Sequence, residues 1–220
     1  MLRWLRFFER RRDAEGPFPL NAPLESLRYA VIDTELTSLN TRSNRLLSIG
    51  AVGMDGTRIR LNRQLYCVVN PGVPVPEAGV PIHGLRPCDV ETGLAPGKAL
   101  ADLRAFVEGA VLVGHFFQID RSVLRKELGS TGHRLENPAI DTARVHRWIV
   151  RHSGYTDDLA HRLEQVDLRS LAAAYHLESH EAHHALDDAF LTARLWQKLI
   201  HILHAMHIRD LDGLLRIAGV

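Results

Sequence analysis

An apolar run that ends in two acids is the feature of this sequence that most constrains its fold. Residues 29–32 are apolar and typical of a buried strand; Asp33 follows them directly and Glu35 comes two positions later. Alternate residues of a strand point to the same face, so the two carboxylates should project together. Negative charges so close repel each other, and burial makes their ionisation more costly. The pair predicts a cation between the acids, basic partners from elsewhere in the fold, or a strand end exposed to water.

The order of the strand and helix patterns predicts one mixed sheet. Three strand patterns come before any convincing helix, and Asp-Gly-Thr at 55–57 predicts a hairpin turn between the last two. After a proline-rich loop at 71–87, helix patterns alternate with short apolar strands. Strands are expected at 28–35, 45–55, 57–71 and 110–115, a strand running into a helix at 138–150, and helices at 97–110, 118–130, 167–177 and 183–207. Such an order is typical of an α/β sheet flanked by helices.

Composition excludes few classes of function. The chain has 220 residues, enough for one sizeable α/β domain, and a formal net charge of +1, so any basic surface for a nucleic acid must be local. Cys67 and Cys88 lack the paired spacing of a metal site, which favours a reduced, cytoplasmic compartment. No apolar run is long enough for a transmembrane segment.

Three parts of the chain are expected. Residues 1–27 combine a basic amphipathic helix pattern with a proline-rich linker, residues 28–205 hold the domain, and residues 206–220 are a C-terminal helical tail. The N-terminal helix should either pack on the domain or bind a membrane surface, a phosphate backbone or a partner protein.

Two of the helix patterns direct an acid towards the core. On a helical wheel of residues 118–130, Asp120 lies within the apolar stripe, and the basic residues lie on the other side. In the pattern at 183–207, Asp188 shares the apolar face, whereas Asp187 lies a quarter turn away. An inward acid without a partner is unfavourable by several kcal/mol or becomes protonated.

Carboxylates from three segments that point into one core suggest a metal site. They offer only oxygen ligands, so Mg²⁺ or Mn²⁺ fits better than Zn²⁺, and two such ions are the usual apparatus of phosphodiester cleavage. A histidine is the natural base, and residues 179–188 contain His180, His183 and His184. This tract could also be a solvated loop and helix start; a zinc site there would lack a third soft ligand.

Three short motifs resemble those of the histidine-type DEDD 3′→5′ exonucleases. They are "DTELTSL" at 33–39, "HFFQID" at 115–120 and "HHALDD" at 183–188, with a histidine five residues before the last Asp. The family includes the proofreading epsilon subunit of bacterial DNA polymerase III, RNase T and oligoribonuclease. The resemblance covers about residues 28–200. It implies a ribonuclease-H-like α/β fold with a mixed five-stranded sheet flanked by helices.

The resemblance also implies a role for each site residue. The metal-binding and catalytic acids would be Asp33, Glu35, Asp120 and Asp188, and the general base would be His183. Two ions of Mg²⁺ or Mn²⁺ would occupy the site, with Asp33 bridging them. The backbone around Thr34 and Leu36 would grip the 3′-terminal nucleotide, and His83 would line that pocket.

Some positions depart from the family or stay outside the implied site. The family often has Asn where Phe116 stands and Phe where Ile119 stands, and neither change removes a ligand or the base. Asp141 matches a recurrent family Asp but is expected to cap its helix. Three histidines near one helical face are expected to be solvated or paired rather than to bind a second metal: His201, His204 and His207.

The function implied is two-metal-ion hydrolysis of phosphodiester bonds from a single-stranded or frayed 3′ end of DNA, in replication or repair, with release of nucleoside 5′-monophosphates. One alternative is an RNA 3′-trimming ribonuclease, because recognition of the 2′-hydroxyl depends on contacts that the sequence does not reveal. Another is a non-catalytic nucleic-acid-binding or scaffold subunit that binds a polymerase or other protein through its N-terminal helix. A silent module should have lost an acid or the base, and none is lost.

Overall fold

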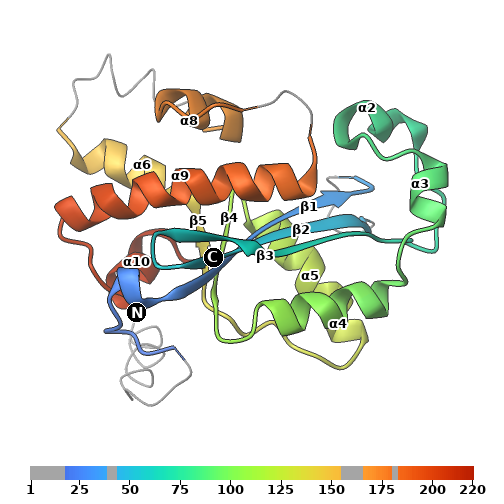
Figure 1. The fold of residues 1–220 in the computed structure, drawn as a ribbon, viewed down its shortest axis with the longest axis horizontal. Coiled ribbons are helices and arrows are strands. Elements are labelled where there is room, and N and C mark those ends of the chain that lie inside the picture. Colours follow the sequence, from blue (N-terminus) through green and yellow to red (C-terminus); the bar gives the residue numbers. More distant parts are fainter. Residues whose placement is uncertain (1–17, 39–43, 155–165, 180–182) are drawn as a thin grey trace, which may run out of the picture.

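A mixed five-stranded sheet forms the middle of the molecule (Figure 1). This computed structural model describes residues 18–38, 44–154, 166–179 and 183–220. The strand order is β3-β2-β1-β4-β5; the pairs β1–β2 and β2–β3 are antiparallel, and β1–β4 and β4–β5 are parallel. The strands are β1 (Arg28–Leu36), β2 (Leu46–Asp55), β3 (Arg58–Val68), β4 (Val111–Gly114) and β5 (Ala139–Asp141). The predicted fold class is confirmed.

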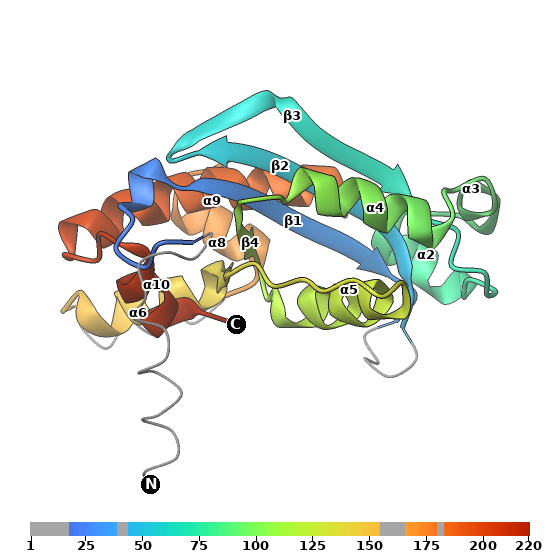
Figure 2. The ribbon, with the colours of Figure 1, turned by 90° about the horizontal axis from the view of Figure 1, so that it is seen from below.

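Helices cover both faces of the sheet, as Figure 2 shows with α4 and α5 on the near side and α9 on the far side. The near layer consists of α4 (Pro96–Phe106) and α5 (Gln118–Ser130). The other layer contains α6 (Thr142–His152), α8 (Leu168–Ala174), α9 (Ala185–Ala205) and α10 (Leu211–Ala218). Among the helices described, none has the length and apolar character needed to cross a bilayer.

Each face of the sheet has its own apolar core, as the alternation of strand side chains requires. Tyr29 and Val31 belong to the core under α9, and Ala30 and Ile32 belong to the core under α4 and α5. The fully buried Trp196 of α9 lies edge-on against Tyr29, with ring centroids 5.5 Å apart. Because β1 is packed on both faces, the side chains at its carboxyl end can meet residues from both helix layers.

The start of α9 lies directly on the sheet because β2 has a glycine there. Gly50 pairs with Asp33 in the β1–β2 ladder. A Cβ at Gly50 would lie 2.2 Å from the carbonyl carbon of Ala185 and 2.3 Å from its oxygen, so only a residue without a side chain permits this approach. The contact holds the first turn of α9, which carries Asp188, beside the end of β1.

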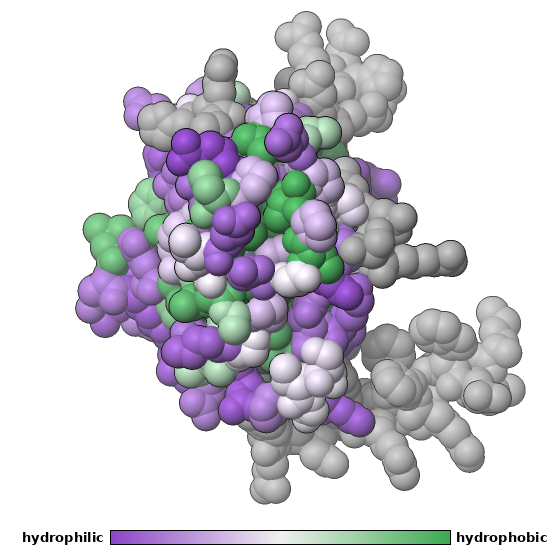
Figure 3. All heavy atoms as spheres, turned by 90° about the vertical axis from the view of Figure 1, so that its right-hand side faces the viewer, coloured by the Kyte–Doolittle hydropathy of each residue, from purple (hydrophilic) through white to green (hydrophobic). Residues whose placement is uncertain are grey.

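The proline-rich loop contains more helix than the sequence predicts. Three short elements lie where the proline-rich loop is expected: η2 (Glu77–Gly79), α2 (Val80–His83) and α3 (Pro87–Glu91). Leu85 and Val90 pack on Leu47 of β2 in a small separate core. Tertiary packing therefore stabilises turns whose own sequence patterns are weak. The side of the molecule that carries α2 and α3 shows apolar patches scattered among polar ones (Figure 3).

Described residues on both sides of the expected domain pack against it. Leu24, in η1 (Leu24–Ser26), donates its backbone N–H to the carbonyl of Arg209 at 2.9 Å. Leu24, Leu211 and Leu214 share the core that contains Trp196. The division into 1–27, 28–205 and 206–220 stays a prediction, and the expected N-terminal helix falls on residues 1–17, outside those that the structure describes.

Gly50→Ala should destabilise the fold, because its Cβ meets backbone atoms that cannot move without shifting α9. An overpacking cost of about 1–3 kcal/mol is expected, measured as the free energy of unfolding in urea. Gly53→Ala is the matched control in the same strand, since the nearest atoms to its Cβ would belong to the flexible Arg63 side chain rather than to backbone. Equal losses in the two variants would contradict the close approach of α9.

Candidate active site

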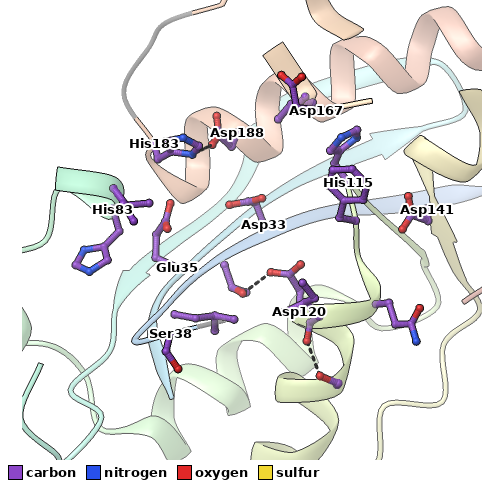
Figure 4. A pocket seen from close by; sticks show the side chains of 18 of the residues that line it. Asp33, Glu35, Ser38, His83, His115, Asp120, Asp141, Asp167, His183 and Asp188 are labelled. Atoms are coloured by element: carbon purple, nitrogen blue, oxygen red, sulfur yellow. Dashed lines mark hydrogen bonds and ion pairs between the residues drawn. The ribbon is translucent and has the colours of Figure 1, made fainter. Parts of the chain in front are cut away.

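The carboxyl end of β1 sends side chains to both helix layers (Figure 4). Asp33 and Glu35 lie on the α9 side, and both line a cavity of about 1120 Å³. Thr34 alternates to the other side, where its hydroxyl donates a hydrogen bond to the Asp120 carboxylate. One strand therefore positions two acids directly and a third through a neighbouring hydroxyl.

The acid on α9 is the one that the helical phase predicts. The Asp188 side chain is 8% exposed, whereas that of Asp187 is 68% exposed. Carboxylate oxygens of Asp33, Glu35 and Asp188 lie within 4.8 Å of one another, the only group of potential metal ligands of this kind among the described residues. Hard divalent cations take such oxygen ligands, so the donor set fits Mg²⁺ or Mn²⁺.

Asp120 of α5 is buried next to this group rather than within it. Its helix turns Val123 and Leu124 into the core on the same face, as the wheel predicts. Asp120 lines the same cavity as Asp33, and its charge is the strongest of the charges that raise the pKa of Asp33. The four acids expected from the sequence thus meet at one cavity.

Burial and nearby negative charges raise the pKa of three of these acids, Asp33, Glu35 and Asp120. Burial raises the pKa of Asp33 well above its usual range, and the charges of the neighbouring acids raise it further. Burial, followed by the charges of Asp188 and Asp120, raises the pKa of Glu35 to about 7. Burial also raises the pKa of Asp120 to about 6, although the Thr34 hydrogen bond lowers it. A divalent cation would relieve this repulsion.

Arg169 is a functional neighbour that the sequence analysis missed. Its guanidinium, from the first turn of α8, donates to both carboxylate oxygens of Asp188 at 3.0 and 3.3 Å. The Arg169 charge lowers the pKa of Asp33 and Glu35 against the larger effects of burial and repulsion. Basic partners from elsewhere in the fold were one of the possibilities left open, but nothing in the helix pattern at 167–177 marks this arginine.

The two adjacent histidines face different partners. The Nδ1 of His183 lies 3.4 Å from an oxygen of Asp188, and its half-exposed ring lines the cavity. His184 instead stacks on Tyr66 of β3, with ring centroids 4.5 Å apart, and its Nδ1 lies 3.5 Å from Asp187. His183 is therefore the histidine next to the acids.

The expected nucleotide pocket lines the same cavity. Thr34, Leu36 and His83 are all part of its wall. The Nδ1 of His83 accepts the backbone N–H of Leu85 at 3.1 Å, and burial lowers the pKa of His83. A neutral ring with Nδ1 as acceptor carries its proton on Nε2, which is buried and has no hydrogen-bond partner among the described residues.

Two residues outside the expected site have structural partners. The Asp141 side chain accepts the backbone N–H groups of Ala143 and Arg144, so it caps α6 as expected, although it also borders the cavity. His204 pairs with Glu25 at 2.7 Å.

The sheet and its flanking helices define the class: the fold is that of ribonuclease-H-like exonucleases. E. coli Exonuclease I, solved in complex with a dT13 oligonucleotide, has a TM-score of 0.69 and 16% identity, covering 82% of this chain and 42% of that chain. Exonuclease X, solved in complex with 5′ overhanging duplex DNA, has a TM-score of 0.60 and 20% identity, covering 86% of this chain and 97% of that chain. At such identities the likeness shows the fold alone.

The chain belongs to the RNase_T family, described as Exonuclease, which matches residues 30–196. The DNA polymerase III subunit epsilon-like protein of Rhodobacter capsulatus is 30% identical over 196 residues, 88% of this chain but 26% of that protein. The DNA polymerase III subunit epsilon of Aquifex aeolicus is 24% identical over 176 residues, 80% of this chain and 81% of that protein. The chain also spans only 12% of the DNA polymerase III PolC-type of Caldanaerobacter subterraneus. The predicted family is confirmed.

Asp33→Asn should raise the Tm measured in EDTA, and more at pH 7.5 than at pH 5. A carboxyl whose pKa is raised in the folded state holds a proton that the unfolded chain releases, so its contribution to the free energy of unfolding falls as pH rises through this window. A gap of at least about 2 °C at pH 7.5 is expected, and Mn²⁺ should reverse it by stabilising the wild type.

Burial lowers the pKa of His83 and of His115, so the contribution of each to the free energy of unfolding rises with pH, opposite to that of Asp33. The Tm of the variant is therefore compared with that of the wild type at each pH, because both proteins contain these histidines. A gap that shrinks from pH 5 to pH 7.5 would show that Asp33 is not held protonated.

Proposed function

We propose that this chain is a divalent-metal-dependent 3′→5′ exonuclease that releases nucleoside 5′-monophosphates from DNA. The observation that carries the proposal is the meeting of Asp33, Glu35, Asp120, Asp188 and His183 at the wall of one cavity. The 3′→5′ polarity rests on the motif resemblance. DNA is favoured because relatives are named as DNA polymerase III subunits, and two neighbours were solved in complex with DNA.

Four acids of this chain would hold the metal ions. Asp33, Glu35 and Asp188 offer oxygens to one cation, and Asp33 with Asp120 would hold a second. Bound there, the cations would lower the pKa of an attacking water and stabilise the leaving oxygen. Arg169 donates to both carboxylate oxygens of Asp188 and offsets part of its negative charge.

His183 is proposed to take the proton from the attacking water. Its ring is beside Asp188 and half-exposed to the cavity, so a water near the acids is within its reach. The Asp188 carboxylate holds the ring by Nδ1 and leaves the other nitrogen available. Leu36 and His83 would hold the 3′-terminal nucleotide. Binding of a polymerase or other protein through the N-terminal helix remains a prediction, and residues 1–17 lie outside the described residues.

The proposal is tested with 5′-labelled single-stranded DNA, duplex DNA with a mismatched 3′ end and RNA of the same sequence, in Mg²⁺, Mn²⁺ or EDTA. We expect stepwise shortening from the 3′ end, release of 5′-mononucleotides, and no cleavage in EDTA. Asp188→Ala should abolish cleavage, and the adjacent Asp187→Ala should retain most of it. Undiminished cleavage in EDTA would rule out the metal site, and faster cleavage of RNA than of DNA would reassign the substrate.

His183→Ala should lower kcat by roughly 10²–10⁴-fold, the usual worth of a positioned base, while Mn²⁺ binding is largely retained. His184→Ala is the matched control, because His184 is turned to Tyr66 and Asp187. The measurement is turnover at saturating Mn²⁺ for both variants. A larger loss of kcat in His184→Ala than in His183→Ala would show that His183 is not the base. Small losses in both variants would exclude a histidine base.

A further inference from the structure

Phe116 is an exposed aromatic residue in the cavity wall that the catalytic proposal does not use. It follows β4, precedes α5, and is 41% exposed. Its backbone has a φ of 51°, in the left-handed region, which is unfavourable for a bulky side chain. Residues held in such conformations cluster at ligand sites, because the surrounding structure must hold them there.

The packing of Phe116 points to a ligand rather than to a core role. Its ring meets the His115 ring edge-on, with centroids 4.7 Å apart. His115 is itself fixed, because its ring nitrogens lie 2.8 Å from the Thr142 hydroxyl and 2.6 Å from the carbonyl oxygen of Val166. A rigid neighbour therefore supports one side of the ring of an aromatic residue that is 41% exposed.

Two arginines of α6 add positive charge at this part of the cavity. The Arg147 guanidinium carbon lies 6.0 Å from the centroid of the Phe116 ring, within the range of a cation–π contact. Across the part of the chain that the structure describes, no carboxylate pairs with Arg147. Arg144 is held by the carbonyl of Gly219 and the side chain of Gln118. An exposed aromatic ring beside arginine side chains is the combination that binds the bases and phosphates of single strands.

The position of Phe116 relative to the acids indicates which nucleotide it meets. His83 lies on one side of Asp33 and Glu35, and His115 and Asp141 lie on the other (Figure 4). With the scissile phosphate at the acids and the 3′-terminal nucleotide on the His83 side, the preceding nucleotide extends towards His115 and hence towards Phe116. This step rests on the proposed function.

We propose that Phe116 and Arg147 form a stacking site for the base of the nucleotide that precedes the 3′-terminal one in a single strand. Phe116 stacks on the base, and Arg147 stabilises both the ring and the adjacent phosphate. A stacked base must be unpaired from its complement, so the site selects single-stranded or frayed ends.

The test compares kcat/KM for wild type and Phe116→Asn on a 5′-labelled dT10 oligonucleotide, intact or with an abasic residue second from the 3′ end. Asn tolerates the left-handed backbone, so the variant should keep or raise the Tm. Loss of one stacked base should lower kcat/KM by about five- to hundredfold. The abasic residue should cause a similar loss in wild type and little further loss in the variant. Phe116→Trp should retain the wild-type rate.

Leu61→Asn is the matched control, because Leu61 is 68% exposed on β3 and is not part of the cavity wall. If Phe116→Asn and the abasic residue each lowered kcat/KM and the two losses multiplied when combined, the stacking site would be overturned. An undiminished kcat/KM in Phe116→Asn would overturn it too. A fall in Tm together with kcat/KM would make Phe116 a structural residue. A wild type that releases no nucleotide from intact dT10 would instead reject the proposed function itself.

Discussion

Repulsion among buried carboxylates is the constraint on which the rest of this structure depends. Oxygens of Asp33, Glu35 and Asp188 lie within 4.8 Å of one another at the wall of one cavity, and the neighbouring charges add to burial in raising the pKa of Asp33 and Glu35. Arg169 supplies part of the missing positive charge. Gly50 is what brings the acid of α9 this near, since any side chain there would hold the helix off the sheet. Packing of α9 on β2 therefore brings together carboxylates that repel one another, and a bound cation would offset that repulsion.

The sequence predicts those features that depend on periodicity and misses those that depend on tertiary contacts. The strand alternation around Asp33 and the helical phases of Asp120 and Asp188 follow from local geometry, and the burial of both helix acids agrees with them. Arg169 was missed because its reach across to Asp188 is set by how α8 packs. The motif spacing implies His183 as the base, but the stacking of His184 on Tyr66 joins residues far apart in the chain and could not be read from a local pattern.

The solved structures show the fold of this chain, and the family match shows the class of protein to which it belongs. Solved exonucleases at 16–20% identity share the architecture, while the match over residues 30–196 establishes the family. The chain spans about a quarter of its Rhodobacter capsulatus relative, so that protein's remaining length says nothing about this one. Differences between members should lie in the cavity wall beyond the acids, where Phe116 and Arg147 stand.

The alternation of β1 has a consequence for how the sheet assembles. Asp33 and Glu35 point to one helix layer, while Thr34 reaches Asp120 in the other. A slip of β1 by one residue would exchange the two faces. It would drive both carboxylates into the apolar core that contains Phe117 and Leu124, where each unpaired charge is strongly unfavourable. The residues that suit this strand to nuclease chemistry thus also discriminate against mispaired sheets during folding.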